Sequence, residues 1–286
     1  MRKEKQIVKK FYDTFGWHKN TDGIYNDTSG AVDLRSVLDS YYHKTHMRVK
    51  NFLISRGEYF LDAGSGAIPQ PELLEYSSSY KRRVCIDLSE RALMEARAKL
   101  KEQGLYVLAD VANLPFKDGV FDAIVSAHVL YHVPQDEQES AVIELHRTMK
   151  CGSSCVIIYV WPTCLLTKIA KLFNARWIIA KISGTRLRKI VKRVLQIFDD
   201  EKHEGGSRPP LYLHAHNYQW FQKIVPYDWN VDIRCWRSVD NIFTETLVPN
   251  NFWGRLLMKL IFWLETVFPH ALAKIGAYPM IIIRKK

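Results

Sequence analysis

Short apolar runs alternate with helical segments between residues 57 and 160, and this alternation constrains the fold more than any other feature of the chain. Short, continuous apolar runs are typical of strands that are buried on both faces of a parallel sheet. Helical stretches between such strands predict a doubly wound α/β fold with right-handed crossovers. The predicted strands are residues 59–61, 84–86, 106–108, 121–126 and 155–160.

Residues with known capping preferences mark the ends of several predicted helices. Ser89 can cap a helix that Gly104 ends, and a second helix covers residues 140–150 with Gly152 beyond it. Farther along, Asn217 caps a short helix at 218–225. An amphipathic helix is predicted at 251–268, and further strands at 231–235 and 279–284.

Positive charge is concentrated in the second part of the chain. Residues 1–160 hold 21 basic and 21 acidic side chains, whereas residues 161–286 hold 20 and 9. The stretch 165–198 reads as helical and basic. Such a segment either faces an anionic partner or is an ordinary solvated surface, and the sequence leaves both interpretations open.

Composition places the chain among globular proteins. Of 286 residues, 47% are hydrophobic and 25% charged, close to the usual proportions. The length fits one large domain or a core with an added cap. The five cysteines are widely spaced and predict no disulfide framework. Without a secretory signal or a long apolar run, we expect a cytoplasmic location.

The glycine-rich segment Asp62-Ala63-Gly64-Ser65-Gly66 directly follows the first predicted strand. Glycine lets a backbone approach a ligand closely and adopt positive φ. Asp87 lies 21 residues beyond Gly66, at the end of the second predicted strand. A carboxylate at that place can accept hydrogen bonds from both hydroxyls of a ribose.

The same segment argues against a dinucleotide. A dinucleotide turn would need a third glycine or alanine where the chain has Pro69. The carboxylate of Asp62 would repel a pyrophosphate but attract an ammonium or sulfonium group. S-adenosylmethionine carries both cations, so it fits the segment better than NAD.

On these residues the sequence resembles the class I S-adenosylmethionine-dependent methyltransferases of the small-molecule type, with a methyltransferase-11-like domain over about residues 58–160. Four further motifs follow the glycine segment in the family's order. They are Val84–Ser89, Ala109–Val111, Leu114–Phe116 with Phe121–Ser126, and Met149–Gly152.

The resemblance implies a seven-stranded Rossmann-like sheet whose last strand is antiparallel, with residues 236–278 inserted between the final two strands. The expected divisions are 1–56 (helical lid), 57–161 (cofactor-binding core), 162–217 (basic helical cap) and 218–286 (the rest of the core). Ile68 replaces the motif's third glycine, and Pro69 and Pro71 follow. We therefore expect the first helix to start late or to be distorted.

The resemblance also implies the ligand contacts of S-adenosylmethionine, whose product is S-adenosylhomocysteine. Separate groups of residues would contact the methionine end, the ribose, the adenine and the surroundings of the reactive methyl. In that order they are Asp62, Ala63, Gly64, Ser65 and Gly66; Asp87 and Leu88; Asp110 and Val111; and Ser126, Ala127 and His128.

Histidines are the candidate catalytic residues. His128 acts either as a base or as a polar residue that orients the cofactor. His214 and His216 alternate on an extended piece, so they would face one side and contact the acceptor, or else be ordinary loop histidines. The aromatic segment 41–46 closes the pocket or simply packs. His128 and Tyr131 stand where related enzymes carry acids, so we expect no metal.

Methyl transfer to a small molecule, most often at an oxygen of a metabolite, glycan or lipid-like intermediate, is the predicted function. The alternatives are a nucleic-acid methyltransferase, a membrane-surface enzyme with a lipid-linked substrate, and a cofactor-binding module without catalysis. The basic pI of 9.3 favours nucleic acid, but Ser126–Val129 lacks the turn of amino-methylating enzymes. Residues 165–198 and 251–268 have the composition of an element at an anionic membrane surface, which would make the protein peripheral.

Overall fold

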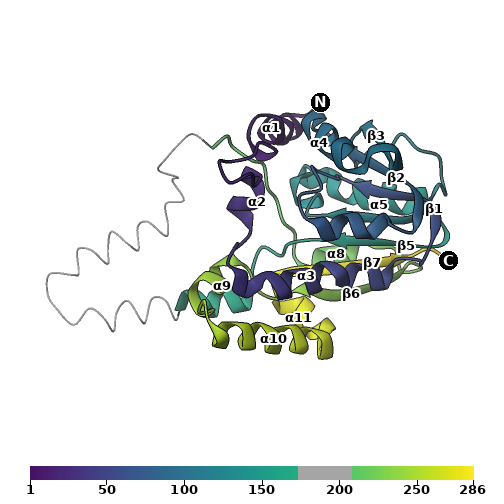
Figure 1. Cartoon of the computed structure of the whole chain (residues 1–286). Coiled ribbons are helices and arrows are strands. Elements are labelled where there is room, and N and C mark those ends of the chain that lie inside the picture. Colours follow the sequence, from purple (N-terminus) through teal and green to yellow (C-terminus); the bar gives the residue numbers. More distant parts are fainter. Residues whose placement is uncertain (173–207) are drawn as a thin grey trace, which may run out of the picture.

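The computed structural model describes residues 1–172 and 208–286, and its centre is one seven-stranded sheet (Figure 1). The strand order is β3-β2-β1-β4-β5-β7-β6. Strands β1 to β5 pair in parallel, and β7 pairs antiparallel with both neighbours. The predicted doubly wound sheet with an antiparallel last strand is thus confirmed. The strands are β1 (Gly57–Ala63), β2 (Tyr80–Asp87), β3 (Gly104–Leu108), β4 (Phe121–Ala127), β5 (Met149–Ile158), β6 (Asn230–Arg237) and β7 (Tyr278–Arg284).

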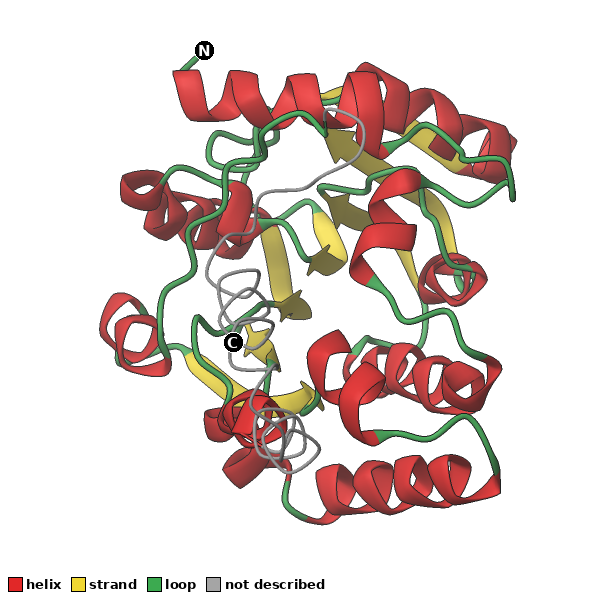
Figure 2. Ribbon diagram, turned by 90° about the vertical axis from the view of Figure 1, so that its left-hand side faces the viewer, coloured by secondary structure: helices red, strands yellow, loops and turns green. Residues whose placement is uncertain are grey.

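Most residues of the central strands are buried because both faces of the sheet are covered (Figure 2). Side chains alternate between the faces with a period of two residues. Leu61 and Ile124 pack on the face that holds α5 (Gln138–Thr148) and α8 (Tyr218–Ile224). Phe60 and Val125 pack on the opposite face, against η3 (Arg48–Phe52) and η4 (Pro71–Ser77).

Helix α4 (Glu90–Leu100) begins where the sequence predicts and ends earlier. The Ser89 side chain accepts a hydrogen bond from the backbone N–H of Ala92, which confirms the predicted cap. The helix stops at Leu100 because Lys101 takes a φ of 48°. Gly104 is the first residue of β3 and does not end the helix, so that prediction was wrong. Gly152 likewise lies inside β5.

The predicted distortion after the first strand is confirmed. The short 3₁₀ helix η4 stands between β1 and β2, at the place of the first core helix. Gly64, Gly66 and Ile68 all have positive φ, of 76°, 54° and 50°. Pro71 then opens η4, where its missing N–H costs no hydrogen bond. The direction of the chain through this turn is therefore set by residues with positive φ and by prolines.

The N-terminal segment crosses from one end of the sheet to the other (Figure 1). In α1, Lys5 forms ion pairs with Asp110 and Glu137 of the core. At the other end, α3 packs on the C-terminal insertion through Tyr41 and Met258. The elements are α1 (Lys3–Phe11), η1 (Tyr12–Gly16), α2 (Asn26–Ala31), η2 (Ser36–Leu38), α3 (Asp39–Met47) and η3.

The C-terminal part contains both predicted helices, together with the cap predicted for the first of them. The side chain of Asn217 caps α8, and that of Asn251 caps α10 (Phe252–Val267). The sequence did not predict α9 (Asn241–Leu247) or α11 (Pro269–Ile275). The remaining short helices are η5 (Lys101–Gln103), η6 (Leu130–His132) and η7 (Gln135–Glu137).

The structure bears on the predicted basic helix and on the question of a membrane-spanning helix. Residues 165–172 are helical, and the rest of the predicted basic helix 165–198 lies outside the described residues. Across residues 1–172 and 208–286, no single helix is long and apolar enough to cross a membrane. Helices α10 and α11, which meet at an angle of 109°, are long and apolar enough only when the two are taken together.

Candidate functional site

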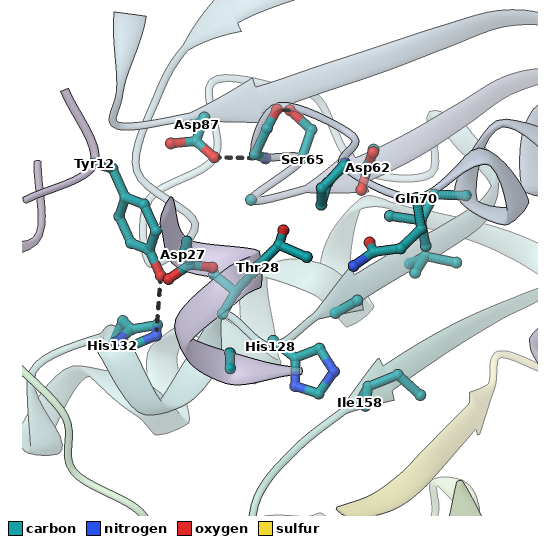
Figure 3. A pocket seen from close by; sticks show the side chains of 18 of the residues that line it. Tyr12, Asp27, Thr28, Asp62, Ser65, Gln70, Asp87, His128, His132 and Ile158 are labelled. Atoms are coloured by element: carbon teal, nitrogen blue, oxygen red, sulfur yellow. Dashed lines mark hydrogen bonds between the residues drawn. The ribbon is translucent and has the colours of Figure 1, made fainter. Parts of the chain in front are cut away.

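A cavity of about 620 Å³ opens where β1, β2 and β4 end (Figure 3). Ligands of open α/β sheets bind at the carboxyl ends of the strands. Segments far apart in the sequence line it: the glycine turn, the N-terminal segment, residues 208–213 and the adjoining ends of β6 and β7. Of the predicted contact residues, those that line it are Asp62, Gly64, Ser65, Gly66, Asp87, Leu88, Asp110, Val111, Ala127 and His128.

Two predicted contact residues do not reach the cavity. Ala63 and Ser126 are fully buried and are not among its lining residues. Both stand on strands next to residues that do line it, such as Asp62 and Ala127. Because successive side chains of a strand point to opposite faces, they are directed into the core.

The glycine turn is shaped by close packing as well as by positive φ. A Cβ on Gly64 would lie 2.3 Å from a methyl of Val129, and one on Gly66 would lie 2.5 Å from the Trp17 ring. The backbone N–H groups of Gly64 and Ser65 both donate to the carbonyl of Ile86, at 2.9 Å. The turn is thus fixed to the end of β2, which brings it beside Asp87.

Asp87 is a buried carboxylate whose partners are backbone N–H groups. One oxygen accepts from the N–H of Gly66 and the other from that of Ser89, each at 2.9 Å. Among the described residues it has no cationic partner. Burial, opposed by these two hydrogen bonds, raises the pKa of Asp87 to about 6. A carboxylate in this setting still has lone pairs for neutral donors, which fits the two hydroxyls of a ribose.

The other two predicted acids already have cationic partners. Asp62 accepts hydrogen bonds from the buried guanidinium of Arg83, with its Nε at 3.1 Å. This ion pair compensates much of the negative charge that was expected to attract an ammonium group. Asp110 pairs with Lys5, which closes the end of the cavity beside β3. Both carboxylates nevertheless line the cavity.

His128 projects into the cavity from the end of β4 (Figure 3). Its φ is 63°, and its ring lies 5.1 Å from that of Trp236 and 5.6 Å from that of Tyr278. Burial, helped by the nearby charge of Arg237, lowers the pKa of His128 to about 3. The imidazole is neutral at pH 7, and so low a pKa weakens the prediction that it is a general base.

The remaining histidines differ in their surroundings. His132 lies 2.8 Å from the carbonyl of Tyr212 through Nδ1 and 3.3 Å from the Tyr12 hydroxyl through Nε2, as a structural histidine would. His214 and His216 share one side of an extended segment, with rings 4.7 Å apart. Neither lines the cavity, and His216 stacks on Trp220 at 3.8 Å. The segment's other side, with Leu211 and Leu213, faces the cavity, an arrangement that fits the alternative of ordinary loop histidines better than contact with the acceptor.

Several lining residues were missed as candidates. Tyr12 and Trp17 belong to the aromatic-rich N-terminal segment, but no local pattern marks Asp27 or Arg237. From the segment 41–46, expected to close the pocket or simply to pack, Tyr42, His43 and His46 line the cavity. Burial raises the pKa of Asp27 to about 6, against the opposing charge of Arg208. Within the described parts of the chain, no cluster of three or more His, Cys, Asp or Glu side chains could hold a metal ion.

Comparison with known proteins relates the core to methyltransferases. A family profile described as "Methyltransferase domain" matches residues 61–157. The ubiquinone/menaquinone biosynthesis C-methyltransferase UbiE of Desulfotalea psychrophila is 32% identical over 77 residues, 27% of this chain and 30% of that protein. The 24-methylenesterol C-methyltransferase 2 of Arabidopsis thaliana is 30% identical over 140 residues, 47% of this chain and 38% of that protein. The chain thus spans about a third of the length of these curated relatives.

Among solved structures, magnesium protoporphyrin IX methyltransferase from Synechocystis PCC 6803, with bound S-adenosylhomocysteine, covers nearly the whole chain. The TM-score is 0.56 at 14% identity, and the match covers 99% of this chain and all of that one. At this identity the match shows a common fold that extends beyond the profile, into the N-terminal and C-terminal parts.

Proposed function

We propose that this chain, whose residues 61–157 form a methyltransferase domain, is an S-adenosylmethionine-dependent methyltransferase acting on a small molecule. The observation that carries the proposal is Asp87, a buried carboxylate held beside the glycine turn by two N–H groups and lining the cavity without a cationic partner among the described residues. The product would be S-adenosylhomocysteine and the methylated acceptor.

The lining residues divide between the two ends of the cofactor. Asp87 and Leu88 would hold the ribose, while Asp110 and Val111 would border the adenine. The turn from Asp62 to Gly66 would border the methionine end. When bound, S-adenosylmethionine supplies a methyl group on a sulfonium, which is already a good leaving group. The protein's own contribution is then mainly to orient the acceptor and to exclude water from a cavity with aromatic walls.

Asp27 supports oxygen as the methylated atom. A hydroxyl acceptor gains reactivity when a base removes its proton, and an efficient base has a pKa near the operating pH. The Asp27 carboxylate lines the cavity, and its pKa of about 6 suits this role better than that of His128, about 3. His128 would then orient the acceptor as a neutral hydrogen-bonding group.

Calorimetric titration tests the cofactor assignment. We expect micromolar binding of S-adenosylmethionine and S-adenosylhomocysteine and no binding of NAD. A screen of hydroxyl-bearing acceptors, read by mass spectrometry for a gain of one methyl group, then tests the reaction. In that assay Asp27→Asn should lower kcat about 10²- to 10⁴-fold without weakening cofactor binding. Failure of both adenosyl ligands to bind would refute the proposal.

One surface favours a second candidate, an enzyme that works at an anionic membrane. Helix α10 exposes a stripe of large apolar side chains: Phe252, Trp253, Leu256, Leu260, Trp263 and Val267. Arg255 and Lys259 are exposed on the same helix, and its one acid, Glu265, is buried. Trp and Phe beside basic residues are typical of helices that lie in a membrane interface.

Co-sedimentation with vesicles tests this candidate. Wild-type protein should bind vesicles containing phosphatidylserine and not vesicles of phosphatidylcholine alone. Trp253→Gln combined with Trp263→Gln should abolish binding. Tyr227→Gln, which removes a fully exposed aromatic outside α10, is the matched control and should bind normally. Equal binding of all three proteins would exclude α10 as the contact surface.

A further inference from the structure

Arg237 at the end of β6 is a buried cation that has no anionic partner among the residues that the structure describes. Its side chain is only 5% exposed, and it forms no ion pair with any carboxylate in residues 1–172 or 208–286. Aromatic rings surround the guanidinium instead, with the centroids of Tyr278 at 4.5 Å, Tyr42 at 5.0 Å and Trp236 at 5.3 Å. Burying a charge in this way is unfavourable unless an opposite charge joins it.

Arg237 differs in this respect from the other buried cations of the cavity. Lys5 pairs with Asp110, and Arg83 pairs with Asp62. Arg208 acts electrostatically on Asp27. Among the described residues, Arg237 is thus the buried cation of the cavity that has no carboxylate beside it, and its strand β6 lies at the opposite edge of the sheet from β3, which precedes Asp110.

Unpaired hydrogen-bond donors gather around this charge. The Nε of Arg237, the hydroxyl of Tyr42 and the indole Nε1 of Trp236 are buried without a hydrogen-bond partner among the described residues. All three residues line the cavity. Buried polar groups of native proteins are nearly always paired, so unpaired donors around one cation indicate a missing acceptor. Their number and single charge match a carboxylate better than a doubly charged phosphate.

The position of Arg237 separates it from the residues expected to hold the methionine end, the ribose and the adenine of the cofactor. Strand β6 is three strands away from β4 in the sheet, about 14 Å at the usual strand spacing. The glycine turn follows β1, which lies still farther away. Near Arg237 is instead His128, which shares Trp236 and Tyr278 as neighbours and directly follows β4, beside the expected methyl group.

We infer that the acceptor carries a carboxylate, which binds Arg237 and Tyr42 and thereby places the acceptor's reactive group beside His128. This inference rests on the proposed methyltransferase function and adds the chemical class of its substrate. The aromatic walls formed by Tyr42, Trp236 and Tyr278 fit an acid with a flat or apolar body.

Binding of matched acids and amides tests the inference. The probes are 4-hydroxybenzoate, cinnamate and octanoate with their neutral amides, titrated calorimetrically into protein saturated with S-adenosylhomocysteine. At least one acid should bind ten- to a hundredfold more tightly than its amide, the effect expected of a charge-assisted pair. Arg237→Gln should abolish that preference, and Arg237→Lys should keep part of it. Tyr42→Phe should weaken only the acid.

The controls distinguish this inference from the proposed function. Arg234→Gln removes a half-exposed arginine of the same strand, paired with Asp232, and should bind acids as the wild type does. Thermal unfolding establishes that each variant is folded. Equal affinity for acid and amide, or no binding of either, would overturn the inference. If S-adenosylhomocysteine still bound normally, the proposed methyltransferase function would be unaffected by that result. Loss of S-adenosylhomocysteine binding in Arg237→Gln would also overturn it, because Arg237 would then hold the cofactor's carboxylate.

Discussion

Replacing Asp87 with alanine should remove S-adenosylhomocysteine binding while leaving the protein folded. The carboxylate would accept both ribose hydroxyls, and a hydrogen bond to a charged group contributes about 1.5–3 kcal/mol. Loss of the two corresponds to about 3–6 kcal/mol, or about a 10²- to 10⁴-fold rise in Kd. Gly66 and Ser89 also lose their acceptor, which loosens the glycine turn and moves the effect toward the upper end.

The same residue predicts a pH dependence. Only the ionised carboxylate accepts from both hydroxyls, and burial raises the pKa of Asp87 to about 6. Affinity should therefore be constant above about pH 7 and fall about tenfold for each pH unit below the pKa. Cofactor binding lowers this pKa, so the fall in affinity begins near the pKa of the free protein and levels off only below the lower pKa of the complex.

Calorimetry between pH 5 and pH 8 measures both effects. Glu90→Ala is the control, because it removes an exposed carboxylate three residues away. Cooperative thermal unfolding establishes that each variant is folded. Micromolar binding by a folded Asp87→Ala variant would refute the assignment of the ribose site, and so would a wild-type affinity that rises toward pH 5.

Other predictions concern stability and the pH profile of the reaction. Glu265→Ala should lower the free energy of unfolding by about 3–5 kcal/mol, because the buried carboxylate of Glu265 accepts hydrogen bonds from Tyr41, Arg48 and Ser238. Its loss leaves the guanidinium of Arg48 without its carboxylate partner. Chemical denaturation would measure the change, and a loss below about 1 kcal/mol would contradict the reasoning. Asn251→Ala should cost about 1 kcal/mol by removing the cap of α10, measured in the same way, with Asn230→Ala outside any cap as the control. Because burial lowers the pKa of His128 to about 3, His128→Gln should leave the shape of the kcat/KM profile unchanged between pH 5 and pH 9, and a limb near pH 6.5 that vanished in this variant would show the histidine to be titrating.

The sequence by itself determined the architecture of the core. The order of strands and helices follows from local periodicity, because a run of apolar residues suits a strand covered on both faces in any surroundings. The caps Ser89 and Asn217 could be predicted for the same reason, since a cap bonds to N–H groups two or three residues away. The positions of the glycine turn and of Asp87 could also be predicted from local sequence, because each directly follows or ends a short strand.

Tertiary structure alone assembled the end of the cavity that we propose binds the acceptor. Tyr42, His128, Arg237 and Tyr278 meet there from four separate parts of the chain, and no local pattern relates them. The alternation of His214 and His216 correctly predicted that both lie on one side of their segment. Which side of that segment faces the cavity was decided only by the fold. Burial and the loss of solvent around a charge depend on every segment packed against it. For that reason the unpaired charge of Arg237 and the raised pKa of Asp27 arise only in the folded molecule.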